Sequence, residues 1–352
     1  MNAALFPAPF ATTFSAILSI FTIGIGALLF SATAGAADTL PMPKDGWVSW
    51  DVPTVDQAPA WCCFTDGRVS SETWGQCDLE RKSYGSSSRN HETTDTMRIY
   101  AHFAAGTLTR LRALAPSCEV KPVAGMKMLG EIAPDASARW LGSALSALQA
   151  APEGQKTADI DKRLLHDLLA ATAIHRGNVA RDVLVAQARS GSTSLRKEAI
   201  FWIGQARGEE GAGLLTPFLF DDADPKIREH AAFSVSQSRS QRAVALLIKQ
   251  GETDRDAKVR SQAWFWLAQT QSKEAEAAIN RAIRRDPERR VRHQAIFALS
   301  QLPSARAVSA LAAVAEDRSL DRDDRKQAVF WLGQNGSEAA TAYIDRLLTS
   351  AK

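Results

Sequence analysis

The stretch Val259–Gln269, V-R-S-Q-A-W-F-W-L-A-Q, decides the fold because it is one of five copies of a repeated phrase. Every copy has Arg at position two, Ala at five, Phe at seven and Gln at eleven. The copies begin 32, 32, 32 and 33 residues apart. A fixed period in this range indicates stacked units that each bury an apolar face against their neighbours. The copies are Leu195–Gln205, Ile227–Gln237, Val259–Gln269, Val291–Gln301 and Asp324–Gln334.

The phrase has the pattern of a helix. Because each helical residue advances by about 100°, positions one, five and nine share a face, as Val259, Ala263 and Leu267 do. These positions are mostly aliphatic or Ala, so they should pack against a second helix. Each unit is therefore predicted to pair a phrase helix with an antiparallel partner helix. The predicted partner helices are Leu214–Phe220, Arg242–Gln250, Glu274–Arg285, Arg306–Glu316 and Ala339–Leu348.

The chain ahead of the first phrase is also predicted to be helical. Asp135 can cap a helix over Ser137–Ala150, and Asp159 or Asp161 can cap a second helix that ends at Ile174. This pair lacks the phrase, as terminal repeats often do, because one of its faces meets no neighbour. A further helix is predicted over Asn178–Arg189.

The repeats resemble the HEAT repeats, especially the short bacterial variety found also in phycobilisome lyase-like proteins. The clearest instance is the string D-P-K-I-R at Asp224–Arg228, where a turn Asp is followed by Arg. The resemblance covers roughly residues 135–352 and implies an all-α, right-handed α-solenoid in a family mainly of scaffolds and adaptors. The first copy has no Asp in the turn before Leu195, and the last begins with Asp324 where an aliphatic residue is usual.

The same resemblance implies a ladder of ion pairs that links one unit to the next. The phrase Arg would pair with a turn Asp, and a structural ladder is favoured over a ligand clamp. The implied ladder comprises Arg196, Arg228, Arg260, Arg292 and Arg325 with Asp224, Asp256, Asp286 and Asp321.

A second helix face is rich in amides and aromatic rings. Positions four, eight and eleven fall together there, with the phrase Phe beside them. Helix stability does not require Gln at one fixed exposed position, so this face is a candidate groove for an extended partner. The alternative is that the Phe row is a seam between phrase helices and that the Gln row hydrogen-bonds along the stack. The candidate partner-binding residues are Trp202, Gln205, Gln237, Gln262, Trp266, Gln269, Gln301, Gln327, Trp331 and Gln334.

The region before the repeats contains all four cysteines, Cys62, Cys63, Cys77 and Cys118. An even count in an exported chain indicates two disulfides, with three possible connectivities. We favour pairing Cys62 and Cys63 each with Cys77 or Cys118, because adjacent cysteines would form a strained ring. A zinc site is disfavoured because Cys62 and Cys63 lack the usual two-residue spacer, and Cys77 and Cys118 have no Cys or His close to them in the sequence.

This region is predicted to be small, partly β and stapled by its disulfides. Alternation over Met97–Leu114, with a break at Ala105 and Gly106, predicts a hairpin. Its tryptophans are Trp47, Trp50, Trp61 and Trp74, which could form its core or a sugar-binding platform; a core is the simpler interpretation.

The first 37 residues contain no Lys, Arg, Asp or Glu and combine an apolar run with a small-residue exit, which is typical of a signal peptide. An uncleaved anchor over Phe14–Phe30 is the alternative. The predicted organisation is a signal peptide at 1–37, a Cys/Trp-rich region at 38–125 and a HEAT-like repeat domain at 126–352. The mature protein would be periplasmic or secreted, with no stable membrane span.

The sequence contains no sign of catalysis or of nucleic-acid binding. Lys and Arg exceed Asp and Glu only by 42 to 39, which is too mild an excess for nucleic acid. No nucleophile elbow, phosphate loop or metalloprotease helix is present. We therefore expect no catalytic residues, metal or cofactor. The favoured function is an exported scaffold that binds a protein partner, and the alternative is a binder of cell-wall glycan.

Overall fold

The structure is a computed structural model that describes residues 40–64, 77–80, 85–150 and 158–350. These residues belong to one compact unit, Thr39–Lys352. The predicted signal peptide at 1–37 and Trp74 lie outside the described residues.

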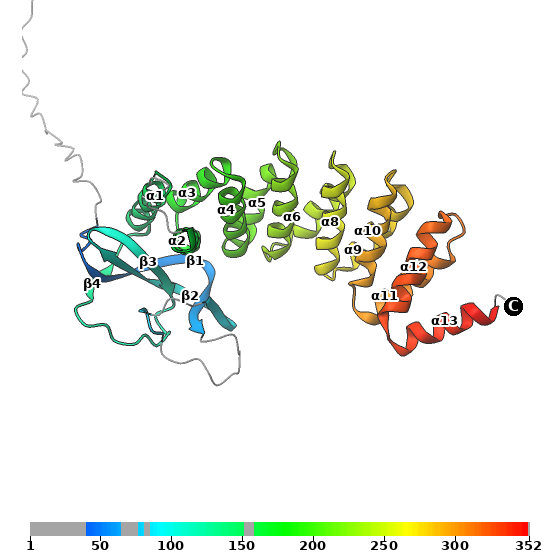
Figure 1. The fold of residues 1–352 in the computed structure, drawn as a ribbon, viewed down its shortest axis with the longest axis horizontal. Coiled ribbons are helices and arrows are strands. Elements are labelled where there is room, and N and C mark those ends of the chain that lie inside the picture. Colours follow the sequence, from blue (N-terminus) through cyan, green and yellow to red (C-terminus); the bar gives the residue numbers. More distant parts are fainter. Residues whose placement is uncertain (1–39, 65–76, 81–84, 151–157, 351–352) are drawn as a thin grey trace, which may run out of the picture. The chain divides into compact units, whose positions relative to one another are not determined.

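A mixed four-stranded sheet precedes the helices (Figure 1). Its order is β3-β2-β1-β4, in which β1 pairs antiparallel with β2 and parallel with β4. The predicted hairpin is confirmed, since Ala104 pairs with Thr107 across a turn in which Ala105 and Gly106 both have positive φ. The strands are β1 (Gly46–Phe64), β2 (Gly85–Ala104), β3 (Thr107–Leu114) and β4 (Lys127–Glu131).

Thirteen helices follow within the described residues, and the predicted alternation of phrase and partner helices is confirmed. The first three are α1 (Pro134–Ala150), α2 (Ala158–Ile174) and α3 (Asn178–Arg189). The phrase helices are α4 (Thr193–Ala206), α6 (Pro225–Gln237), α8 (Ala257–Gln269), α10 (Arg289–Ser300) and α12 (Arg322–Asn335). The partner helices are α5 (Gly208–Phe220), α7 (Ala243–Thr253), α9 (Lys273–Arg285), α11 (Ser304–Glu316) and α13 (Glu338–Ser350).

The helix starts differ from the sequence prediction at the first pair. Helix α1 begins at Pro134, so Asp135 lies in its first turn instead of capping it. Helix α2 begins at Ala158, which places Asp159 and Asp161 inside the helix. Proline at the first helical position needs no backbone N–H partner and favours an earlier start. In the repeats, by contrast, Asp224 is an N-cap as its position before Pro225 suggests.

Phrase helices contact phrase helices and partner helices contact partner helices, so the units stack in two layers. Val259, Ala263 and Leu267 are fully buried between the layers, as the helical period predicted.

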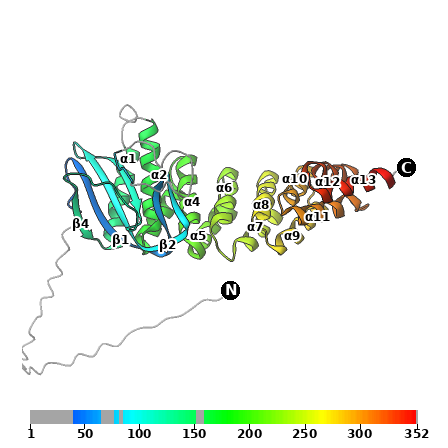
Figure 2. The ribbon, with the colours of Figure 1, turned by 90° about the horizontal axis from the view of Figure 1, so that it is seen from below.

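The sheet shares this core. Trp50 of β1 and Leu168 of α2 belong to one buried cluster that continues into the repeats, and Figure 2 shows the strands beside α1 and α2. Within the described part of the chain, no helix has the length and apolar character needed to cross a bilayer.

Candidate functional site

An aromatic row runs along the phrase helices. The Phe201 and Phe233 rings stack with centroids 6.0 Å apart, and Phe265 and Phe297 stack in the same way at 5.9 Å. Tryptophans join these pairs, because Trp266 lies 4.8 Å from Phe233 and Trp331 lies 4.8 Å from Phe297. The phrase Phe residues therefore form a seam between units, which was the alternative interpretation to an open groove. Only its last member, Phe330, is left 52% exposed.

A row of exposed glutamines lies at the ends of the same helices. The position-eleven side chain is exposed in all five copies. The hydrogen bonds found for Gln237 and Gln301 run to the adjacent hydroxyls of Ser236 and Ser300, not from one unit to the next. These amides thus keep donors and acceptors for another molecule. The row comprises Gln205, Gln237, Gln269, Gln301 and Gln334, whereas Gln262 and Gln327, at position four, are half-buried nearer the start of their helices.

Trp202 does not belong to this exposed surface, contrary to the sequence prediction. It is only 7% exposed because Trp61 of β1 packs on it at 5.4 Å and His166 of α2 at 5.0 Å. Glu198 accepts hydrogen bonds from Trp202 Nε1 and from His166 Nδ1, at 3.0 and 2.5 Å. The hydrogen bond to Glu198 raises the pKa of His166. Burial by itself would raise the pKa of Glu198, but the contacts with His166 and Trp202 outweigh burial and lower that pKa. Trp202 therefore anchors the sheet to the repeats.

The phrase arginines form ion pairs between successive units. Arg228 binds both carboxylate oxygens of Asp254, at 2.8 and 2.9 Å, and also donates to the carbonyl of Asp222 in its own turn. The pairs continue from Arg260 to Asp286 at 2.8 Å. Two of the remaining phrase arginines also form ion pairs: Arg196 with Asp222, and Arg292 with both Asp321 and Asp324. Arg325 instead donates to the carbonyl of Leu320.

Two of the predicted ladder aspartates have another role. Asp224 and Asp256 cap α6 and α8 by accepting from the backbone N–H of Lys226 and Lys258. An N-cap carboxylate satisfies donors that the first helical turn leaves unpaired. The acceptors for the arginines are instead Asp222 and Asp254, two residues earlier, which the sequence reasoning missed although both stand in the same turns.

A hollow of about 690 Å³ opens between α10 and α12 on the phrase-helix face. Phe297 and Trp331 contribute aromatic surface, and the amides of Gln294 and Gln327 lie beside them. The other lining residues are Glu288, Arg289, Arg290 and His293. The unusual Asp324 lies next to the hollow, 1% exposed, where it contacts Arg292 at 2.7 Å and His293 at 3.3 Å.

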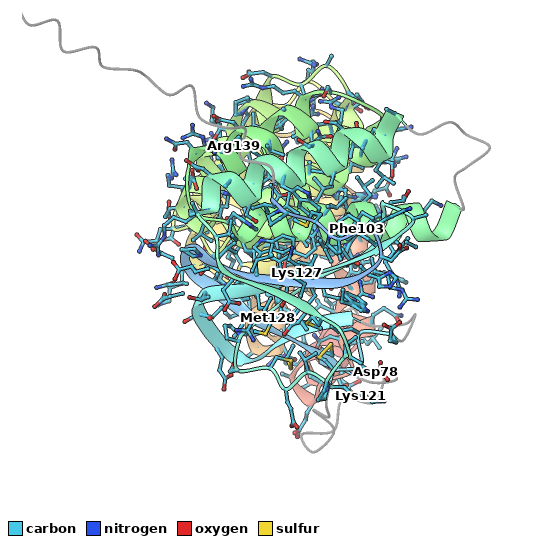
Figure 3. The ribbon with its side chains drawn as sticks, turned by 90° about the vertical axis from the view of Figure 1, so that its left-hand side faces the viewer. Asp78, Phe103, Lys121, Lys127, Met128 and Arg139 are labelled. Carbon is cyan, nitrogen blue, oxygen red and sulfur yellow. A yellow bond between two sulfur atoms is a disulfide. The ribbon has the colours of Figure 1, made fainter. Side chains whose placement is uncertain are left out.

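The sheet region contains the two expected disulfides, Cys62–Cys118 and Cys63–Cys77. Sulfur atoms of Cys62, Cys77 and Cys118 lie within 4.8 Å of one another, but disulfide sulfurs are not thiolates, and it is the thiolate that ligates metal. Near these bridges Lys121 Nζ lies 3.5 Å from Asp78 Oδ2. Figure 3 labels both side chains, which lie next to each other. Cys63, Cys77 and Cys118 belong to a small buried cluster that is separate from the core shared by the sheet and the helices.

The proposed sugar platform is not available among the described tryptophans of the sheet. Trp47, Trp50 and Trp61 are all buried. Trp50 donates from Nε1 to Ser137 Oγ at 2.8 Å, and Ser137 Oγ lies 2.8 Å from Nε2 of the buried His175. Burial in low dielectric lowers the pKa of His175 to about 4. These rings are core residues, as the simpler interpretation held.

The sequence profile of the HEAT repeats matches residues 181–263 and 244–323. No curated protein matches the sequence. Several solved structures are similar to this chain. The structure of human deoxyhypusine hydroxylase in complex with glycerol is 17% identical in sequence, with a TM-score of 0.27, and the match covers 60% of this chain and 90% of that one. The complex of CpcE and CpcF of phycocyanin lyase from Nostoc sp. is 21% identical, with a TM-score of 0.32, over 58% and 80%. The S. pombe condensin Cnd3–Cnd2 subcomplex is 16% identical, with a TM-score of 0.36, over 61% and 32%.

Proposed function

Because this chain is a HEAT-repeat protein, we propose that it is an exported scaffold whose phrase-helix face binds a protein partner. HEAT-repeat folds typically mediate protein–protein interactions, and the stacked units present a long surface of repeated chemistry. Export to the periplasm or beyond is supported by the uncharged first 37 residues and by two disulfides, which persist in oxidising compartments.

The observation that carries the proposal is the exposed glutamine at position eleven of every copy. Exposed helix positions accept many residues without loss of stability. Five exposed glutamines at one position therefore point to a role outside the helices, and amides that donate and accept suit the backbone of an extended peptide. The half-buried Trp266 and Trp331 add flat apolar area beside the row, as binding hot spots often do.

Affinity capture from envelope extract tests this proposal, with the oxidised unit Thr39–Lys352 as bait. We expect the double variant Gln237→Glu/Gln269→Glu to lose the captured protein, because two carboxylates replace two amide donors. The matched control Lys273→Gln/Arg281→Gln makes the same change in charge on the partner helix α9, and it should retain the protein. Trp266→Ala/Gln269→Ala should also lose it while the helical circular dichroism signal stays unchanged. Equal retention by every variant would remove the phrase-helix face from consideration.

A further inference from the structure

The hollow between α10 and α12 differs in charge from the corresponding place two units earlier. Both residues directly before the phrase Val291–Gln301 are basic, Arg289 and Arg290, whereas Pro225 and Lys226 precede the corresponding phrase Ile227–Gln237. In that earlier place Lys258 of α8 is neutralised by Glu229 of α6 at 2.9 Å, and the position of Lys258 is occupied in α12 by Asp323. Position three of the phrase, which provides that Glu229 on α6, is occupied by His293 on α10. The acid on α6 is thus replaced by a histidine on α10, and the positive charge of the hollow comes from the two arginines at the start of α10.

The positive charges of the two arginines in the hollow are not fully neutralised by neighbouring acids. Arg290 is exposed and forms no ion pair with any described residue. Arg289 reaches Asp323 only at 3.4 Å, and both side chains are more than half exposed, so water weakens the pair. The one acid in the lining is Glu288, while Asp324 is already bound by Arg292 at 2.7 Å. The hollow therefore favours an anionic guest.

The rest of the lining defines what surrounds that anion. Phe297 and Trp331 provide aromatic surface at the seam of α10 and α12. Gln294 and Gln327 provide amide groups within the same hollow. Guanidinium groups bind carboxylates through strong charge-assisted hydrogen bonds. A carboxylate that sits next to an apolar side chain and a peptide backbone fits this combination, and an uncharged sugar leaves the arginines without a partner.

We propose that this hollow is the specificity site of the phrase-helix face and that it binds an acidic segment of the protein partner, with Arg290 facing a carboxylate and the Trp331 ring packing against a neighbouring apolar side chain. This inference rests on the proposed function, since it names the chemistry of the partner on that face. It makes recognition dependent on charge at one end of the array and on amides along the rest.

Isothermal titration of the oxidised Thr39–Lys352 unit with synthetic pentapeptides tests the inference. The probe alternates glutamate with phenylalanine, and its matched form has glutamine in place of each glutamate. We expect the acidic peptide to bind at least tenfold more tightly than the amide form, with an affinity that falls as salt is raised. Failure of the acidic peptide to bind at millimolar concentration, or equal binding of the two forms, would overturn the proposal.

Variants place the binding in the hollow. Arg290→Gln should weaken binding of the acidic peptide at least fivefold, whereas Arg281→Gln, an equal change on the partner helix α9, should leave binding unaltered. An equal loss from both variants would mean diffuse charge attraction and would contradict the hollow as the site. A captured partner that depends on Gln237 and Gln269 but not on Arg290 would refute this inference and leave the proposed function standing. Binding of an N-acetylglucosamine oligosaccharide that Arg290→Gln leaves intact, without binding of the acidic peptide, would also refute it.

Discussion

Arg228 and Asp254 form an ion pair in which each side chain is only 2% exposed. Removing one member of such a pair leaves a buried charge without its partner, so we expect Arg228→Ala to lower the free energy of unfolding by about 3–5 kcal/mol. The combined change Arg228→Met/Asp254→Leu should cost far less, because both charges disappear. Urea unfolding measures both, and Arg281→Ala, which breaks an exposed pair with Glu252, should cost below about 1 kcal/mol. A similar loss for the single and double variants would contradict this account.

His175 makes stability depend on pH. Burial lowers its pKa from 6.5 to about 4, so on acidification the unfolded chain takes up a proton near pH 6.5 that the folded chain refuses. Its contribution is therefore complete above pH 6.5 and is lost as the pH falls towards 4, by about 3 kcal/mol. We expect His175→Gln to flatten this part of the pH profile of the unfolding free energy. If NMR shows that the His175 imidazole of the folded protein titrates near pH 6.5, the account is wrong.

Some residue roles could be read from the sequence and others could not. The arginine at position two predicted an ion pair, but several aspartates share each turn, and only the chain geometry assigns Asp254 to Arg228 and Asp256 to the helix cap. Of the face predicted from positions four, eight and eleven, position eleven is exposed in every copy, whereas position four is half-buried in Gln262 and Gln327. The burial of Trp202 was not, because its cover, Trp61, lies in a strand far away in the sequence.

At the scale of the element, the contact between neighbouring phrase helices depends on position ten. Gly204 of α4 lies so close to α6 that an added Cβ would approach the carbonyl oxygen of Ser234 to 2.4 Å. Gly333 has the same phrase position in α12, but there an added Cβ meets nothing within 4 Å. The same substitution should thus have opposite effects at the two sites.

We expect Gly204→Ala to destabilise the protein by about 1–3 kcal/mol, because the two helices must move apart. Gly333→Ala should instead stabilise it by about 0.5–1 kcal/mol, since alanine restricts the unfolded chain and favours the helix. Thermal unfolding of the two variants beside the parent protein measures the difference. Destabilisation by both would mean that glycine at position ten serves a purpose other than close packing.

At the scale of the whole molecule, the sequence predicted the repeats well and their junction with the sheet poorly. Each helix pair repeats the same local pattern, so five copies reinforce one interpretation. The sheet has no such repetition. Of the three possible disulfide connectivities only the Cys62–Cys63 bond was disfavoured, and the choice between the other two depended on the strands, which place Cys62 beside Cys118. The shared core of sheet and helices joins residues distant in sequence, which no periodicity reveals.

That shared core predicts how far a defect at one end should travel. Trp61 is 7% exposed and connects β1 to Trp202 of α4, so Trp61→Ala should remove about 3–5 kcal/mol of packing there. In a repeat array each unit is stabilised mainly by its neighbours. Hydrogen exchange should therefore accelerate in β1, α2 and α4 and fade to the parent rate by α9.

Trp331→Ala at the other end is the matched control, and it should accelerate exchange in α10 and α12 while α2 keeps its protection. If either variant accelerates exchange equally in every helix, the unit Thr39–Lys352 unfolds as one cooperative body. In that case the sheet would stabilise distant repeats as strongly as the first one, and a partner bound near α12 would stabilise the disulfide-bonded sheet to the same extent, by the linkage between binding and folding.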